Sequence, residues 1–213
     1  MPSPPRVLIA SRNVGKLHEL QPMVIAMGFR PVTLDDAGIL ETPDEEALEQ
    51  FDTFEENALA KARWFHALNA GAGAVVVLAD DSGLAVDAFA GAPGVISKRW
   101  SGSGLEGRAQ DDRNNRKLVD ALAGNADRSA RFVCAAALVW RDGEFTERGE
   151  ITGTILDAPR GALGFGYDPF FWSDELQMTL AEATREQKER VSHRGRAVRA
   201  ALGRYARLLP GQQ

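Results

Sequence analysis

The chain has little cysteine and little histidine, and these shortages exclude several kinds of site. Its 213 residues include one cysteine and three histidines, with neither a cysteine pair nor a His-x-x-x-His spacing that would favour zinc. Cys134 falls within the apolar run 132–139, so we expect a small core residue rather than a nucleophile. His18 and His66 fall on expected helices, away from any polar cluster, and are predicted to be surface residues.

Long apolar runs and an excess of positive charge are also missing. No stretch approaches the roughly 18–20 apolar residues of a membrane span, and residues 1–6 lack the apolar segment of a secretory signal. The net charge of −5 argues against polymeric nucleic acid, whose binding needs a basic face. We therefore expect a cytoplasmic protein without membrane or nucleic-acid partners, in which a local basic pocket can still bind one phosphorylated small molecule.

The most informative segment is the acidic pair Asp80-Asp81, followed by Ser82-Gly83. It comes after the apolar run 75–78, which predicts a strand buried on both faces. Open α/β sheets bind ligands at the carboxyl ends of such strands. Because adjacent carboxylates repel each other, a divalent cation with a preference for oxygen ligands, Mg²⁺ or Mn²⁺, would compensate them. The alternative is a polar turn that ends the strand, since Asp, Ser and Gly favour turns.

Hydrophobic periodicity predicts a mixed α/β protein of one domain, with flexible ends at 1–5 and 210–213. Thr53 and Glu56 form a capping box that starts a helix, and Ser192 is expected to cap the last one. Pro22 should kink or delay the first helix. We expect strands at 6–10, 29–34, 75–78, 84–86, 130–141 and 144–156, helices at 17–27, 53–69, 108–123 and 193–209, an acidic loop at 35–52, a loop at 91–104 and a hairpin turn at 142–143.

A polar loop, Ser11–Lys16, joins the first strand to the first helix. Backbone N–H groups at a helix start bind anions, and Lys16 adds a full positive charge, so the loop indicates a phosphate site. It lacks the spacing of a Walker A loop. The alternative interpretation is an ordinary capped helix start with a solvated lysine.

Two later segments carry further candidates. Glycines surround Phe165 and Tyr167, which favours the presentation of an aromatic face, and Asp168 can accept hydrogen bonds from a base. The alternative is a turn whose aromatics fill the core. Near the C-terminus, His193 and Arg194 place positive charge in the first turn of a helix, where it opposes the helix dipole and so indicates a compensating ligand.

Six segments, taken together, resemble the inosine/xanthosine triphosphate pyrophosphatases. They occur in the order of that family and span most of the chain from residue 6 to about 205. The resemblance implies an α/β fold of two lobes, built on a mixed β-sheet with flanking helices, with a nucleotide cleft between the lobes and a homodimeric assembly. The matching segments are 11–16, 53–61, 79–87, 91–95, 164–169 and 192–195.

The same resemblance implies the roles of individual residues. Asp81 would be the catalytic carboxylate and, with Glu49, would bind Mg²⁺, for which Mn²⁺ is a possible substitute. Arg12 replaces a usual glycine, which should stiffen the loop or add a phosphate contact, and the run after Glu49 departs from the usual Glu-Thr-Gly. The implied substrate-binding residues are Ser11, Arg12, Asn13, Val14, Gly15 and Lys16 for the triphosphate, with Lys61 as a helper, Ser82, and Phe165, Gly166, Tyr167, Asp168, Lys188, His193 and Arg194 around the purine.

The expected activity is hydrolysis of the purine nucleoside triphosphates ITP, dITP and XTP to a nucleoside monophosphate and pyrophosphate. Four alternatives remain. A Maf-type pyrophosphatase for pyrimidine triphosphates would share the first loop, but not segments 165–168 and 192–194. A haloacid dehalogenase-type phosphatase would need an Asp-x-Asp spacing that is missing here. The others are a nucleotide sensor without turnover and a protein that binds single-stranded RNA.

Overall fold

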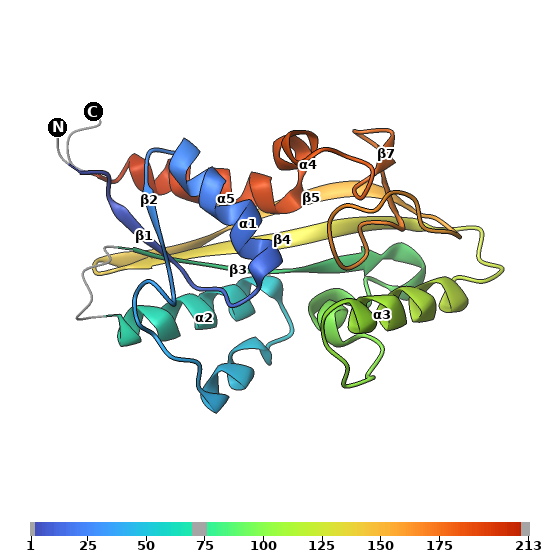
Figure 1. Cartoon of the computed structure of the whole chain (residues 1–213), viewed down its shortest axis with the longest axis horizontal. Helices are drawn as coiled ribbons and strands as arrows, with labels where there is room; N and C mark the ends of the chain where they lie inside the picture. Colours follow the sequence, from blue (N-terminus) through green and yellow to red (C-terminus); the bar gives the residue numbers. More distant parts are fainter. Residues whose placement is uncertain (1–2, 70–75, 210–213) are drawn as a thin grey trace. The chain divides into compact units, whose positions relative to one another are not determined.

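The computed structural model describes residues 3–69 and 76–209, and within these ranges it contains one mixed seven-stranded sheet. The strand order is β2-β1-β3-β4-β5-β6-β7 (Figure 1). β1 is parallel to both β2 and β3, whereas β6 is antiparallel to β5 and β7. The strands are β1 (Arg6–Ile9), β2 (Arg30–Thr33), β3 (Val76–Val86), β4 (Ser129–Trp140), β5 (Gly143–Ile155), β6 (Phe171–Ser173) and β7 (Met178–Thr179).

Five α-helices and three short 3₁₀ helices accompany the sheet in the described ranges, which confirms the predicted α/β class. None of these helices is both long and apolar enough to cross a bilayer. The helices are α1 (Val14–Ala26), α2 (Phe54–Leu68), α3 (Gly107–Ala121), α4 (Arg185–Val191) and α5 (His193–Ala206), with the 3₁₀ helices η1 (Pro43–Glu49), η2 (Asp87–Phe89) and η3 (Gly94–Arg99).

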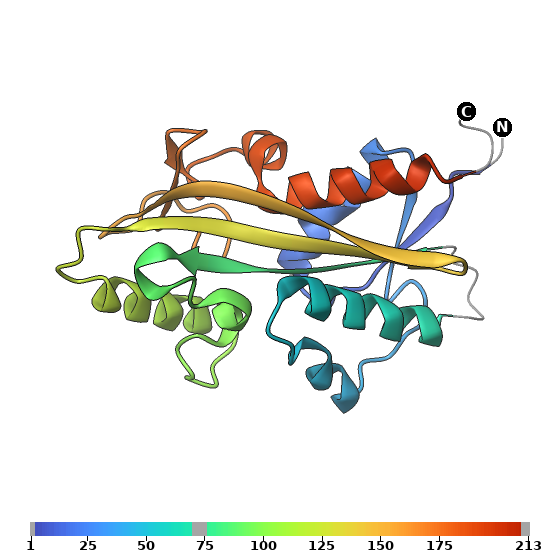
Figure 2. The same cartoon turned by 180° about the vertical axis from the view of Figure 1, so that it is seen from behind.

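The chain divides into two compact units, and β3, β4 and β5 contribute residues to both. Unit 1 contains the described residues of 1–81, 134–149 and 194–213, and unit 2 contains 82–133 and 150–193. In unit 1, α1 and α5 lie on one face of the sheet and α2 lies on the other (Figures 1 and 2). Each unit has an apolar core of its own, so each can hold polar side chains in fixed positions.

The core of unit 1 forms where the apolar sides of α1 and α5 meet strands β1, β3 and β4. Its buried members include Val7 and Val76 on the strands, Leu20 on α1 and Leu202 on α5. Cys134 also belongs to this core, as predicted, and burial raises the pKa of its thiol. The core of unit 2 contains Leu84, Leu118, Leu122, Ile151, Tyr167 and Phe171.

Local signals located several helix starts correctly. Thr53 caps α2 as predicted, by accepting a hydrogen bond from Glu56 N, but the Glu56 carboxylate accepts from the Thr53 hydroxyl rather than from its backbone N–H as a full capping box would require. Asn13 caps α1 in the same way from Lys16 N, so the helix begins at Val14 and the delay expected from Pro22 does not occur. The predicted hairpin is confirmed, but β5 already begins at Gly143, one residue before the expected position.

Four expectations about local structure were wrong. The acidic stretch 35–52 contains η1, which begins at Pro43 after a capping box at Thr42, and the loop 91–104 contains η3. The helix α4, which begins after Thr184, was missed. The last helix, expected to reach residue 209, ends at Ala206, and Leu208 beyond it is exposed. The predicted strand residue 75 and the chain ends 1–2 and 210–213 lie outside the described residues.

The largest correction concerns β3, which does not end at the acidic pair. It runs without interruption from Val76 through Asp80 and Asp81 to Val86, so the expected separate strand at 84–86 is its second half. Asp80 and Asp81 are 1 % and 6 % exposed, respectively. The turn interpretation is therefore wrong as well. A central strand can contain two buried carboxylates only if other side chains compensate their charge.

One prediction tests the tight packing of β5 against β6 in unit 2. An added Cβ at Gly153 would overlap Trp172 O and the Phe171 ring, so Gly153→Ala should lower the free energy of unfolding by about 2 kcal/mol or more. Urea denaturation measures this change. The matched control is Gly203→Ala in α5, where the nearest atom is Met27 Cε at 3.7 Å and the change should be neutral or stabilising. Equal destabilisation by both changes would contradict the described packing.

Candidate active site

The Asp80 carboxylate is the centre of a buried ionic network in unit 1. Its Oδ2 accepts hydrogen bonds from Lys16 Nζ at 3.0 Å and from Arg194 Nε at 3.1 Å. Arg194 Nη1 also donates to Glu19, on α1. Lys16 comes from α1, Asp80 from β3 and Arg194 from α5, so one carboxylate joins three elements.

The charges around Asp80 decide its protonation state. Burial by itself would raise its pKa, but the positive charges of Lys16, Arg194 and Lys61 outweigh burial and hold the pKa well below the usual range of a carboxyl group. Asp80 is therefore ionised at neutral pH. Its second oxygen, Oδ1, is buried and has no hydrogen-bond partner among the described residues.

Asp81, the next residue along β3, has a different environment. Its Oδ2 accepts a hydrogen bond from the neutral amide of Asn57, on α2, at 3.0 Å. Burial raises the pKa of Asp81, and the negative charge of Glu49 adds to that effect, although Lys16 and Lys61 oppose it. Two chemically identical neighbours thus have pKa values shifted in opposite directions, an arrangement that separates a fixed charge from a proton acceptor.

Glu49 and Lys61 complete the polar cluster of unit 1. Lys61 Nζ donates to the Glu49 carboxylate and, at 3.2 Å, to the backbone oxygen of Asp80. Lys16 Nζ donates to the same oxygen at 3.3 Å. The structure therefore brings together Lys16, Glu49, Lys61 and Asp81, all of which the sequence had singled out.

The donor set of this cluster suits a hard divalent cation that also binds phosphate. The described residues contain no group of three or more His, Cys, Asp or Glu side chains that could hold a metal by itself. Mg²⁺ is usually held by only one or two carboxylates, and waters and substrate phosphates complete its coordination. Glu49 and Asp81, whose negative charges repel each other, match that pattern.

The segment Ser11–Lys16 joins β1 to α1 as expected, but only its first three residues are loop, because α1 begins at Val14 and includes Lys16. The Arg12 guanidinium donates to the Glu45 carboxylate, on η1, at 2.8 Å. It also donates to Ile39 O, which precedes η1, at 3.0 Å. These bonds support the expectation that Arg12 stiffens the loop. Ser11 Oγ accepts from Asn13 N at 3.3 Å, and Ser82 follows Asp81 on β3 with its side chain half-buried.

The predicted base-binding segment lies in unit 2 and is held from several sides. Asp168 Oδ2 accepts hydrogen bonds from Phe165 N at 3.0 Å and from Lys188 Nζ at 2.7 Å. The Lys188 ammonium also lies 5.0 Å from the centre of the Phe165 ring. Tyr167 donates its hydroxyl proton to Ser97 O at 2.8 Å and belongs to the core, so its ring fills the interior as the alternative interpretation proposed.

The segment 192–195 is divided between the two units. His193 belongs to unit 2, where its ring stacks on Phe132 with centroids 4.9 Å apart and an interplanar angle of 11°. Arg194 belongs to unit 1 and its guanidinium donates to Asp80 and Glu19. The expected compensation of its charge in the first turn of α5 thus comes from two carboxylates of the protein itself.

Sequence reasoning missed four polar side chains that hold these groups. Glu19 accepts a hydrogen bond from Arg194, and Asn57 donates one to Asp81. Asp111 and Asn115 both bind the backbone of Gly166. Asn57 lies within the segment 53–61 quoted for the resemblance, and Glu19 follows Lys16 by three residues, which places both on the same side of α1. Nothing in the sequence marks Asp111 or Asn115 as different from other polar residues of a surface helix.

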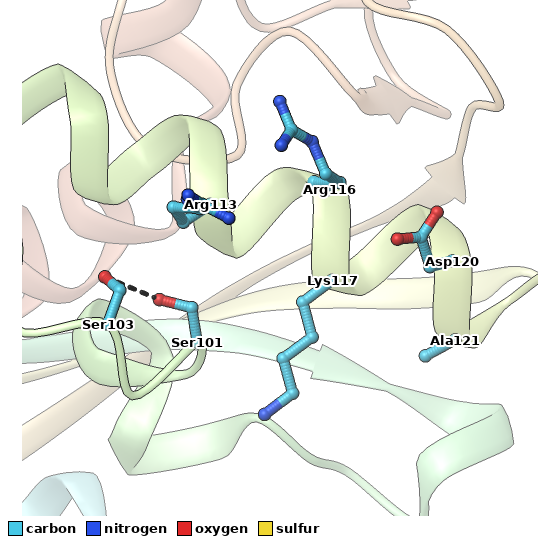
Figure 3. A pocket seen from close by; sticks show the side chains of 7 residues that line it. All are labelled: Ser101, Ser103, Arg113, Arg116, Lys117, Asp120 and Ala121. Carbon is cyan, nitrogen blue, oxygen red and sulfur yellow. Dashed lines mark hydrogen bonds between the residues drawn. The ribbon is translucent and has the colours of Figure 1, made fainter.

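A hollow of about 710 Å³ lies beside α3 in unit 2 and is lined by Ser101, Ser103, Arg113, Arg116, Lys117, Asp120 and Ala121. Its three cations do not converge, because Arg116 and Lys117 point to opposite sides of the helix (Figure 3). Lys117 Nζ instead donates to Trp100 O at 2.6 Å and lies over the Trp100 ring. The hollow is separate from the residues predicted for the site.

Comparisons with known proteins agree with this arrangement. The chain matches the model of the Ham1 family over residues 7–203. It is 47 % identical over 209 residues to a dITP/XTP pyrophosphatase of Nocardia farcinica, with 95 % of this chain and 96 % of that protein covered. It is 46 % identical over 196 residues to a dITP/XTP pyrophosphatase of an Exiguobacterium species, with 91 % and 93 % covered. A HAM1 protein from Coxiella burnetii has a similar structure, with a TM-score of 0.79, 32 % identity and coverage of 95 % of this chain and 99 % of that one.

The ionic network of unit 1 leads to a prediction about stability. Arg194→Met leaves the Asp80 and Glu19 carboxylates without their shared cation, and should lower the free energy of unfolding by about 3–5 kcal/mol. Urea denaturation at neutral pH measures the loss. Arg63→Met removes an exposed pair with Glu144 and should cost less than about 1 kcal/mol. A loss at Arg194 no larger than that at Arg63 would show that the network is not important for stability.

Proposed function

The chain belongs to the Ham1 family, and we propose that it hydrolyses dITP, ITP and XTP to the nucleoside monophosphate and pyrophosphate, and so removes them from the nucleotide pool. The observation that carries this proposal is the buried Asp80–Lys16–Arg194 network directly beside Asp81, in a chain whose relatives of similar length are dITP/XTP pyrophosphatases. The homodimer and the cytoplasmic location expected above remain part of the proposal.

The triphosphate would bind to the polar cluster of unit 1. The first N–H groups of α1, at Val14 and Gly15, have no acceptor within the helix, and the helix dipole favours an anion there. Lys16 and Lys61 bring two ammonium groups to the backbone oxygen of Asp80, near this helix start. Their charge would neutralise phosphate oxygens as charge builds up on the leaving pyrophosphate.

Asp81 is the better candidate for the general base. Asp80 is committed to the cations of Lys16 and Arg194, whereas Asp81 accepts a hydrogen bond from the neutral amide of Asn57 and is not tied up in that ion-pair network. We propose that Glu49 and Asp81 also hold Mg²⁺, with Mn²⁺ as a substitute. When bound, the ion would supply Lewis-acid polarisation of phosphate oxygens.

The purine would be recognised in unit 2, at Phe165–Asp168, Lys188 and His193. Phe165 offers a ring face, and the Lys188 ammonium is a donor for the oxygen at position 6 of hypoxanthine or xanthine. Adenine presents an amino donor at that position, so the buried ammonium would face another donor. A mismatch of this kind costs about 1–3 kcal/mol, which corresponds to discrimination of roughly 5- to 150-fold. The role predicted for Arg194 at the base remains a prediction, since its guanidinium is held by Asp80 and Glu19.

The proposed reaction is tested by pyrophosphate release from dITP, ITP, XTP, dATP, dGTP and dTTP, with Mg²⁺ and with EDTA. We expect metal-dependent turnover of the first three, and a loss of about 10²–10⁴-fold in kcat for Asp81→Asn, because the base is removed. Asn57 can still donate to the new side chain, so the variant should remain folded. Preference for dTTP would assign the chain to a pyrimidine pyrophosphatase, and binding without turnover would make it a sensor.

The base specificity is tested by Lys188→Met. Loss of the ammonium should raise KM for dITP and reduce the preference for dITP over dATP by about tenfold or more, because the donor to the purine oxygen is gone. Steady-state kinetics with both substrates measures the ratio. The matched control is Lys98→Met, which makes the same change at an exposed side chain of η3 in unit 2. An unchanged ratio in Lys188→Met would remove Lys188 from base recognition.

A further inference from the structure

Gly166 is the middle residue of the proposed base-binding segment, and helix α3 holds both polar groups of its backbone. Gly166 N donates to Asp111 Oδ2 at 2.9 Å, and Gly166 O accepts from Asn115 Nδ2 at 2.9 Å. Asp111 and Asn115 are four residues apart on α3 and therefore lie on the same side of the helix, one turn apart. One helix face thus fixes two neighbouring peptide planes of the segment.

Gly166 needs this support because its backbone conformation is unusual. Its φ of +63° lies in the left-handed region, where glycine is strongly favoured, and an added Cβ would meet no atom within 4 Å. The side of Gly166 on which a Cβ would stand thus faces open space. The two hydrogen bonds to α3 hold its backbone N–H and C=O, and they help to set the directions in which the chain continues to Phe165 and Tyr167.

The Asp111 and Asn115 side chains bind Gly166 in surroundings that are unfavourable for a carboxylate and for an amide oxygen. Burial raises the pKa of Asp111, and only the hydrogen bond from Gly166 N opposes this effect, while Asp168 and Asp112 add to it. Asn115 is 6 % exposed, and its Oδ1 is buried without a hydrogen-bond partner among the described residues. Because Gly166 O requires the NH₂ group, the amide cannot turn to relieve that oxygen. A half-buried carboxylate with a raised pKa and a buried amide oxygen without a partner do not stabilise the fold, so we look for a functional reason for these two residues.

The other anchors of the segment bind its neighbouring residues rather than Gly166 itself. Asp168 N donates to Phe165 O at 3.3 Å and so acts on the peptide plane that precedes Gly166. Lys188 and Phe165 N bind the Asp168 carboxylate at one side, and Tyr167 is tied to Ser97 O. None of these bonds acts on Gly166 N or Gly166 O. The clamp formed by Asp111 and Asn115 therefore adds two bonds at Gly166 to those that already hold Phe165 and Lys188 at the Asp168 carboxylate.

We propose that Asp111 and Asn115 are positioning residues for base recognition, which clamp the Gly166 backbone and so set the ring face of Phe165 against Lys188 and Asp168. The inference rests on the proposed function, because it explains how two residues of α3 contribute to the base specificity of the proposed pyrophosphatase reaction. Asp111 and Asn115 belong to unit 2, whereas the polar cluster proposed to bind the triphosphate belongs to unit 1. Their removal should therefore change KM and base preference more than kcat.

The test compares Asp111→Ala with Asp111→Asn and Asp112→Ala. We expect Asp111→Ala to lower the ratio of kcat/KM for dITP over dATP by roughly 5- to 100-fold, mainly through KM for dITP, because the segment loses its bond to Gly166 N. Asp111→Asn retains an oxygen that can accept this bond and should recover most of the ratio. Asp112→Ala removes an equal charge from the adjacent exposed position and should leave the ratio unchanged.

A second measurement separates positioning from general loss of structure. Inorganic tripolyphosphate has no base, so its inhibition constant should be the same in wild type and Asp111→Ala. If Asp111→Ala does not fold, Asn115→Ala removes the bond to Gly166 O from the same clamp and is measured instead. Equal behaviour of Asp111→Ala and Asp112→Ala, or a parallel loss of tripolyphosphate binding, overturns the inference. Absence of dITP turnover in wild type would instead overturn the proposed function.

Discussion

The buried carboxylate of Asp80 is the interaction on which unit 1 depends. A negative charge that is 1 % exposed, in the middle of a central strand, is stable only because Lys16 and Arg194 both donate to it. Replacing the three by apolar residues could give an equally stable core. Stability alone therefore does not explain why the chain has this ionic network. The network also fixes the Lys16 ammonium at the start of α1 and the β3 backbone beside Asp81.

Unit 2 also contains a buried carboxylate that is paired with a lysine, although with fewer partners than Asp80 has. The Asp168 carboxylate is 4 % exposed and is neutralised by Lys188 at 2.7 Å, while Phe165 N donates to the same oxygen. In both units a buried carboxylate holds a lysine in a fixed place, and that lysine is the group proposed to meet the substrate. The ammonium groups are thereby oriented before any ligand arrives, which reduces the reorganisation required on binding.

Sequence signals that act over a few residues predicted secondary structure well, whereas contacts between distant residues could not be predicted from the sequence. Capping residues and periodicity predicted α2, β1, β2 and the β4–β5 hairpin, because those signals act over a few residues. A capping box at Thr184 and Gln187 was also present in the sequence and would have revealed α4. The continuity of β3 could not be predicted, since the charges that compensate Asp80 come from residues 64 and 114 positions away. The clamp on Gly166 was invisible for the same reason, with Asp111 and Asn115 55 and 51 positions away.

The charge balance of unit 1 explains why the roles of the two aspartates differ. Asp80 and Glu19 are matched by Lys16 and Arg194, so that network is neutral as a whole. Asp81 and Glu49 add two negative charges and Lys61, which donates to Glu49, adds one positive charge, so these three side chains together carry one negative charge. A divalent ion would reverse that charge to positive beside a helix N-terminus, where a triphosphate is then attracted. Without the ion, the same carboxylates repel the phosphates. Under the proposed function, the neutral pairing of Asp80 would leave the local sign of charge under the control of Asp81 and Glu49, and affinity for the triphosphate would then depend on the metal.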